Sequence, residues 1–130
     1  MTLIARTVAA LLALFCLGVG GYQLAAPLHF WFNTPGVVGT GGFNAHFIRD
    51  IGIIYVISGG LFLVGLFSAA QRPLAFGTAT AWLAGHALFH GAEVAVGICG
   101  VEAIPRDFPG VTLPALLAAA VTLHSLRRPA

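Results

Sequence analysis

The sequence has few charged residues, and this shortage excludes most kinds of soluble protein. Only 8% of its 130 residues are charged and 58% are hydrophobic, whereas soluble domains carry about 25% charged residues. Lysine is missing altogether, and six arginines stand against four acidic residues, for a net charge of +2. Such sparse, scattered cations do not form the basic patch of a nucleic-acid-binding protein, so we expect no DNA or RNA partner. The composition predicts an integral membrane protein whose main surroundings are the lipid bilayer.

The sequence also lacks the short motifs that identify several enzyme classes. It contains no GxSxG, no phosphate-cradling glycine loop and no HExxH. Its two cysteines, Cys16 and Cys99, form neither a CxxC motif nor a disulfide framework. We expect both to be small apolar residues. Whether the protein is an enzyme stays open on these grounds.

Long apolar runs divide the chain into segments that can cross a bilayer. A hydrocarbon core of about 30 Å needs about 20 helical residues. Four such spans use nearly the whole chain, which leaves one membrane domain over residues 1–130 and no separate soluble domain. We predict spans at approximately 5–26, 44–70, 73–100 and 108–127, with Asn44 as the N-cap of the second. The expected fold is all-α, a four-helix transmembrane bundle.

Two connections carry most of the polar and turn-forming residues. Residues 27–43 are rich in glycine and proline around the cluster Phe30-Trp31-Phe32, which predicts a loop on the membrane surface with its aromatic rings at headgroup depth. A loop of this length can act as a lid over a site or as an interfacial anchor. Residues 101–110 predict a second, polar surface loop, so the last span is short, tilted, or begins earlier, at Asp107.

The arginines predict the orientation of the bundle. Four spans place the two ends of the chain and the 68–73 turn on one side, and these segments contain no acidic residue but four arginines, Arg6, Arg72, Arg127 and Arg128. By the positive-inside rule this side is cytoplasmic. We therefore expect both termini in the cytoplasm of a bacterium and the protein in its inner membrane. The acidic side then faces the periplasm.

Polar residues share one face in each of the two middle spans. His86, His90 and Glu93 are spaced i, i+4 and i+7, so they lie within roughly 60° of one another on a helix. His46 and Asp50, spaced i and i+4, begin the preceding span. Antiparallel neighbouring helices would bring both sets to a similar depth near the acidic side. Ionisable groups in a bilayer are costly and by default mark a functional site.

The residue types in this predicted site favour a transition metal. Imidazole and carboxylate groups bind Zn, Fe, Mn or Cu, and ligands on facing helices are a common way to build such a site in a bundle. The predicted function is metal binding, with redox activity as one form of it. The predicted ligands are His46, Asp50, His86, His90 and Glu93.

Three alternatives remain open on the sequence. One histidine from each helix, for example His46 and His90, would suit a haem, and a quinone would also fit a bundle of this kind. In the third alternative Arg49 pairs with Asp50 or Glu93 in an ionic network, since intramembrane charges usually pair with each other. The protein would then be a small accessory subunit of a larger membrane complex. Glycine-bearing helix faces also make a homo-oligomer plausible.

Two stretches resemble known membrane proteins. The run Gly42-Phe-Asn-Ala-His-Phe-Ile-Arg-Asp-Ile-Gly, followed by Tyr55 and Gly59-Gly60, and the later His-x3-His-x2-Glu are similar to small four-span bacterial membrane proteins of unassigned function, loosely DoxX-like. The resemblance covers the second and third predicted spans. It implies a four-helix membrane bundle, and it implies no catalytic residue because that broad group has no single settled activity.

Overall fold

The structure, a computed structural model, describes residues 1–127. Within this range the chain is helical and contains no strand, which confirms the all-α prediction. Arg128, one of the arginines in the orientation argument, lies outside the described residues. The elements are α1 (Leu3–Ala25), α2 (Pro27–Asn33), the 3-10 helix η1 (Val37–Thr40), α3 (Ala45–Phe67), α4 (Arg72–Ala95), α5 (Ala103–Asp107), the π-helical turn η2 (Phe108–Thr112) and α6 (Leu113–Leu126).

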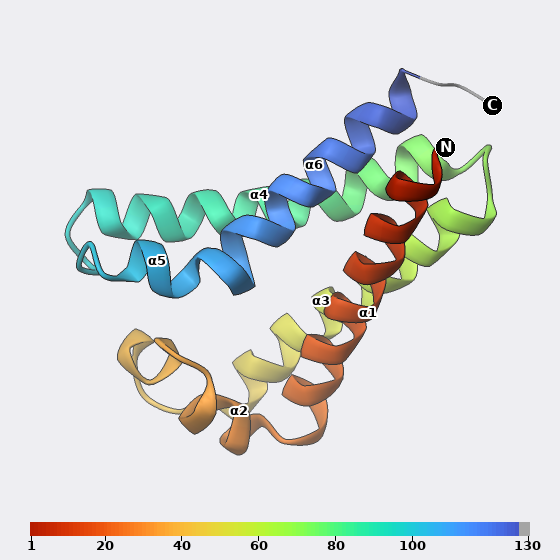
Figure 1. The fold of residues 1–130 in the computed structure, drawn as a ribbon. Coiled ribbons are helices and arrows are strands. Elements are labelled where there is room, and N and C mark those ends of the chain that lie inside the picture. The colour runs from red at the N-terminus through yellow and green to blue at the C-terminus, as the bar shows by residue number, and fades with distance from the viewer. Residues whose placement is uncertain (128–130) are drawn as a thin grey trace.

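The four long helices form two packed pairs that are joined through α3 and α4 (Figure 1). Helix α1 packs along α3, and α4 packs along both α3 and α6. The N-terminus, the α3–α4 connection and the last turn of α6 lie at one end of the molecule. Helix α2 and the α4–α5 connection lie away from that end, as the order of the helices requires.

Polar side chains fix the starts of α1 and α3. Oγ1 of Thr2 accepts a hydrogen bond from the backbone N–H of Ala5 at 3.3 Å, and Oδ1 of Asn44 accepts one from Phe47 at 3.1 Å. The predicted N-cap at Asn44 is therefore confirmed. A cap of this kind contributes about 1 kcal/mol, because it satisfies an N–H that has no partner within the helix.

Two arginines near the starts of long helices cap the end of the preceding long helix. Nε of Arg49, in α3, donates to the carbonyl oxygen of Leu24 at the end of α1, at 3.3 Å. Nε of Arg72, at the start of α4, donates to Gly65 near the end of α3, at 2.7 Å. Carbonyls in a last helical turn lack partners within the helix, and cations are favourable there. Both arginines therefore stabilise a connection between two long helices.

Glycines allow α1 and α3 to approach closely. A Cβ atom on Gly20 would lie 2.6 Å from the carbonyl oxygen of Gly52 and 2.8 Å from Cγ2 of Val56. One on Gly59 would lie 2.7 Å from Cγ of Leu17. Small residues at helix interfaces let backbones come together where lipid supplies no hydrophobic drive for association. The α1–α3 contact therefore depends on glycine at these positions.

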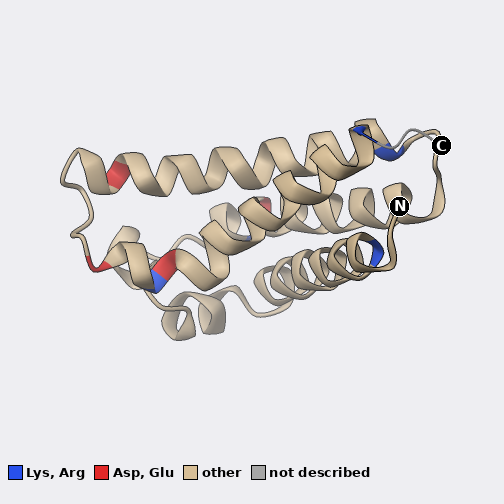
Figure 2. Cartoon of the chain, turned by 45° about the horizontal axis from the view of Figure 1, so that its top comes forward, with Lys and Arg blue, Asp and Glu red and all other residues tan. Residues whose placement is uncertain are grey.

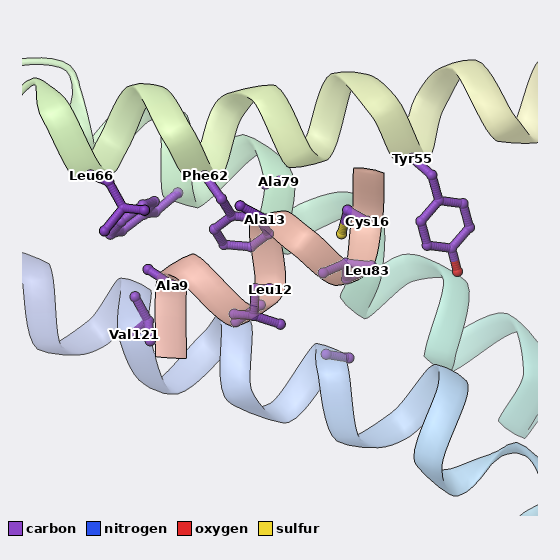
Figure 3. Packing of buried hydrophobic residues seen from close by; sticks show 13 residues of the cluster. Ala9, Leu12, Ala13, Cys16, Tyr55, Phe62, Leu66, Ala79, Leu83 and Val121 are labelled. Carbon is purple, nitrogen blue, oxygen red and sulfur yellow. The ribbon is translucent and has the colours of Figure 1, made fainter. Parts of the chain in front are cut away.

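The core lies between the long helices, each of which contributes to it. Phe62 and Phe76 are its largest fully buried side chains, with ring centroids 5.7 Å apart. Figure 3 shows residues of this cluster: Ala9, Leu12, Ala13 and Cys16 from α1, Tyr55, Phe62 and Leu66 from α3, Ala79 and Leu83 from α4, and Val121 from α6. Cys16 is a free, buried thiol packed as a small apolar residue, as expected.

Several predicted boundaries were wrong. Residues 27–43 are not one loop, because Pro27 begins the helix α2, a position where a proline's missing N–H costs nothing. The third long helix ends at Ala95 instead of residue 100. The predicted loop at 101–110 is instead helical and runs into α6, so the last helical run begins at Ala103. In η2 the N–H of Leu113 donates to Phe108, five residues back.

Three helical runs are long and apolar enough to cross a membrane. They are Leu3–Ala25, Ala45–Phe67 and Ala103–Leu126. Helix α4, of 24 residues, is as long as these but is not among them, because Trp82, His86, His90 and Glu93 lower its hydropathy. The structure therefore supports three of the four predicted spans by length and composition.

Candidate functional site

The polar residues of α3 form a pair on its exposed surface. Nε2 of His46 lies 3.3 Å from Oδ2 of Asp50, one turn further along the helix. The His46 side chain is 89% exposed and that of Asp50 52%. Such an exposed pair is worth little, because solvent screens the charges. The i, i+4 spacing brings these two residues together as predicted, but it does not bury them.

The polar residues of α4 lie against aromatic rings. His86 stacks on Trp82, with ring centroids 5.5 Å apart and ring planes at 17°. Its ring also meets the buried ring of Tyr55 edge-on, at 6.2 Å, and that of His90 at 4.7 Å. Nε1 of Trp82 is buried and has no hydrogen-bond partner among the described residues. The two imidazoles thus adjoin at the boundary between the apolar core and the polar end of α4.

His90 is held by an acidic residue that sequence reasoning missed. Nδ1 of His90 lies 2.9 Å from Oδ2 of Asp107, in α5. Nε and Nη2 of Arg106 donate to the two oxygens of the same carboxylate, at 2.6 Å and 3.0 Å. A carboxylate paired with a guanidinium is ionised and can only accept hydrogen bonds, so Nδ1 of His90 carries the proton. In the neutral imidazole this arrangement leaves the lone pair on Nε2 of His90, where a ligand can bind.

A turn in the 34–43 segment closes on this cluster. Gly36 has φ +86°, the left-handed region that favours glycine. A Cβ atom there would lie 2.6 Å from Cζ of Arg106, so the guanidinium packs directly against the backbone of the turn. Tyr22 and His29, joined by a hydrogen bond between their side chains, connect α1 to α2 just before the turn. The connection after α1 is therefore positioned beside Arg106 and, through it, beside Asp107.

The structure gathers only some of the residues predicted to form one site. His86 and His90 adjoin, and His46 pairs with Asp50, but in the described part of the chain no ion pair joins the two sets. Among residues 1–127, no three His, Cys, Asp or Glu side chains come close enough to hold a metal ion together. The Glu93 carboxylate makes no ion pair within the same range. The shared face of His86 and His90 on α4 was predicted, whereas the contact of His90 with Asp107 was not.

Arg49 does not take part in the ionic network considered above. Its guanidinium donates to a backbone carbonyl of α1, and within residues 1–127 it forms no ion pair with Asp50 or Glu93. Its role in the structure is to cap a helix end. The ionic contacts of the cluster instead involve Arg106.

Comparison with known proteins adds no relative. No family model, no curated protein and no solved structure matches the chain.

Proposed function

We propose that the chain is a four-span protein of a bacterial inner membrane, with α4 as the fourth span. Helix α4 has 24 residues and packs against α3 and α6, two of the apolar helical runs. Its less apolar side chains Trp82, His86 and His90 are partly buried and pack on one another. A helix can lie in a bilayer when its polar side chains face neighbouring helices and not the lipid.

We place both termini in the cytoplasm. Among the described residues, no acidic residue lies at the end that holds the N-terminus (Figure 2). Alkaline phosphatase, which is active only in the periplasm, should therefore be inactive when fused after Ala130 and active when inserted between Gly97 and Ile98. The opposite pattern would reverse the orientation and place the His90 cluster on the cytoplasmic side.

The proposed function is binding of a transition metal by His86 and His90. The observation that supports it is the hydrogen bond from His90 to Asp107. Metal-binding histidines almost always donate their other ring N–H to a carboxylate, carbonyl or water, which fixes the tautomer and makes the free nitrogen more basic. Here Arg106 keeps the carboxylate ionised and oriented. His90 is thus preorganised as a metal ligand, because its tautomer and ring orientation are fixed without the ion.

The donor set fits such an ion in its chemistry. Two neutral imidazoles suit Zn, Cu, Fe or Mn, and Glu93 lies one turn beyond His90 on the same helix face. A bound metal would supply Lewis acidity or, for Fe and Cu, electron transfer. The chain's own part is to hold the two imidazoles, and the rings of Trp82 and Tyr55 cover the ring of His86.

Metal content tests this proposal. We expect wild-type protein purified in detergent to carry or take up close to one ion per chain, and His86→Ala and His90→Ala to lose most of it. The exposed His46 provides the matched control, and His46→Ala should keep its metal. Loss of metal in His46→Ala as well would favour the five-residue site on both helices. A wild-type protein that takes up none of Zn, Fe, Mn or Cu would overturn metal binding.

One observation favours a second candidate, a structural role in an accessory subunit. Asp107 already accepts hydrogen bonds from Arg106 and His90, so these three residues link α4 to α5 without any ligand. In that case its charges offset one another and fix the packing of the two helices. The protein would then purify free of metal. The variant His90→Ala would lower its unfolding temperature without changing its metal content.

A further inference from the structure

The end of the molecule that holds the N-terminus is basic, and its three described arginines have different surroundings. It carries Arg6 in α1, Arg72 at the start of α4 and Arg127 at the end of α6. All acidic residues of the sequence lie in other segments, at Asp50, Glu93, Glu102 and Asp107. No protein carboxylate is therefore at hand to pair with these arginines within the described chain.

Helix ends compensate two of the three charges. Arg72 donates to Gly65 in the last turn of α3, and Arg127 is the C-cap residue of α6. The carbonyl end of a helix is negative, so a cation is favourable at both places. Arg6 is the fourth residue of α1, where the helix dipole is positive and a cation is unfavourable. Arg6 is thus the one arginine at this end that lacks a favourable partner among the described residues.

A groove lies beside Arg6. Its volume is about 270 Å³, and it is lined by Arg6, Thr7 and Ala10 of α1 and by Leu66 and Phe67 of α3. Arg6 is its only charged residue, and Thr7 adds one hydroxyl donor. Phe67 is 84% exposed, so the apolar wall of the groove opens to the surroundings of the bundle. The groove therefore combines a cation and a hydroxyl with an apolar surface that continues toward the bilayer.

We propose that this groove binds an anionic phospholipid. The phosphate lies on Arg6 and Thr7, and one acyl chain follows Ala10, Leu66 and Phe67. The proposal rests on the membrane insertion proposed above. An anionic lipid surface contributes about 1 kcal/mol for each nearby arginine, which corresponds to about a fivefold preference over a neutral lipid.

Lipid-dependent stability in neutral detergent tests the proposal. We expect phosphatidylglycerol to raise the unfolding temperature more than phosphatidylcholine with the same acyl chains, and native mass spectrometry to retain about fivefold more of it. Arg6→Gln should remove this preference, and Arg6→Lys should keep it. Arg127→Gln is the matched control, since it removes the same charge at the same end and should keep the preference. Ala10→Trp, which fills the groove, should weaken retention of both lipids.

The contrary outcomes are distinct. Equal retention of the two lipids by the wild type would show that the groove does not select an anionic headgroup. An equal loss of the preference in Arg6→Gln and Arg127→Gln would show a diffuse attraction of the basic end and no site at Arg6. Inorganic phosphate that raises the unfolding temperature as much as phosphatidylglycerol would show an anion site without a lipid, and would also overturn the proposal. Failure of membrane insertion itself would appear differently, as a protein that stays monodisperse without detergent.

Discussion

Gly20→Ala is expected to destabilise the bundle by about 3 kcal/mol, at the upper end of overpacking costs. The new methyl group would lie 2.6 Å from the carbonyl oxygen of Gly52, and backbone atoms cannot move aside as a flexible side chain can. Helix α1 would have to shift away from α3, its main partner in the fold. Thermal unfolding in detergent measures the effect.

The same substitution one residue later supplies the control. A Cβ on Gly21 would meet nothing within 4 Å, and the same holds for Gly18. Alanine is the better helix former by about 1 kcal/mol, so Gly21→Ala and Gly18→Ala should leave stability unchanged or raise it. The sign of the effect should therefore reverse between neighbouring glycines. Similar losses at Gly20 and Gly21 would contradict the close α1–α3 contact.

Asp107→Asn should lower metal affinity by about 10- to 100-fold, the usual loss when the carboxylate behind a metal-binding histidine is removed. The amide can still accept a hydrogen bond from His90, but it carries no charge to make the imidazole more basic or to pair with Arg106. Titration of detergent-solubilised protein with Zn²⁺ measures the change.

Asp50→Asn is the matched control for this experiment. Asp50 also faces a histidine, but their side chains are largely exposed, so the pair is screened by solvent and its loss should change affinity little. A variant Asp107→Asn that binds Zn²⁺ as tightly as the wild type would show that Asp107 does not prepare His90. A large loss at Asp50 would point to the exposed pair as the binding site.

The long apolar helices could be predicted because their sequences carry strong local signals. Residues 7–25 of α1 and 51–67 of α3 contain no charged residue, and Asn44 marks the start of α3 by satisfying a free N–H. The continuous helix from Ala103 could not be predicted in this way. Its first turns contain Pro105, Arg106 and Asp107, which are typical of a loop. Within the first turn a proline removes no helical hydrogen bond, and the ion pair satisfies the two charges.

The site was predictable within one helix and not between helices. Helical spacing places His86 and His90 on one face, and their rings do adjoin. The expected partner on α3 depended on the relative depth and rotation of two helices, which their spacing does not determine. In the structure α4 ends at Ala95, and the chain returns through a short connection that brings Asp107 beside His90. An acidic residue near the start of the last helix, on the same side of the membrane, was the available signal.

The electron paramagnetic resonance spectrum of bound Cu²⁺ tests metal binding by His86 and His90, because nitrogen hyperfine coupling counts the imidazoles on the metal. We predict one Cu²⁺ per chain with coupling to two imidazole nitrogens in the wild type and in His46→Ala. His86→Ala and His90→Ala should bind much less copper, and the copper that they still bind should couple to one imidazole nitrogen. Copper that shows no nitrogen coupling, or a wild-type spectrum that neither α4 variant changes, would contradict metal binding by His86 and His90.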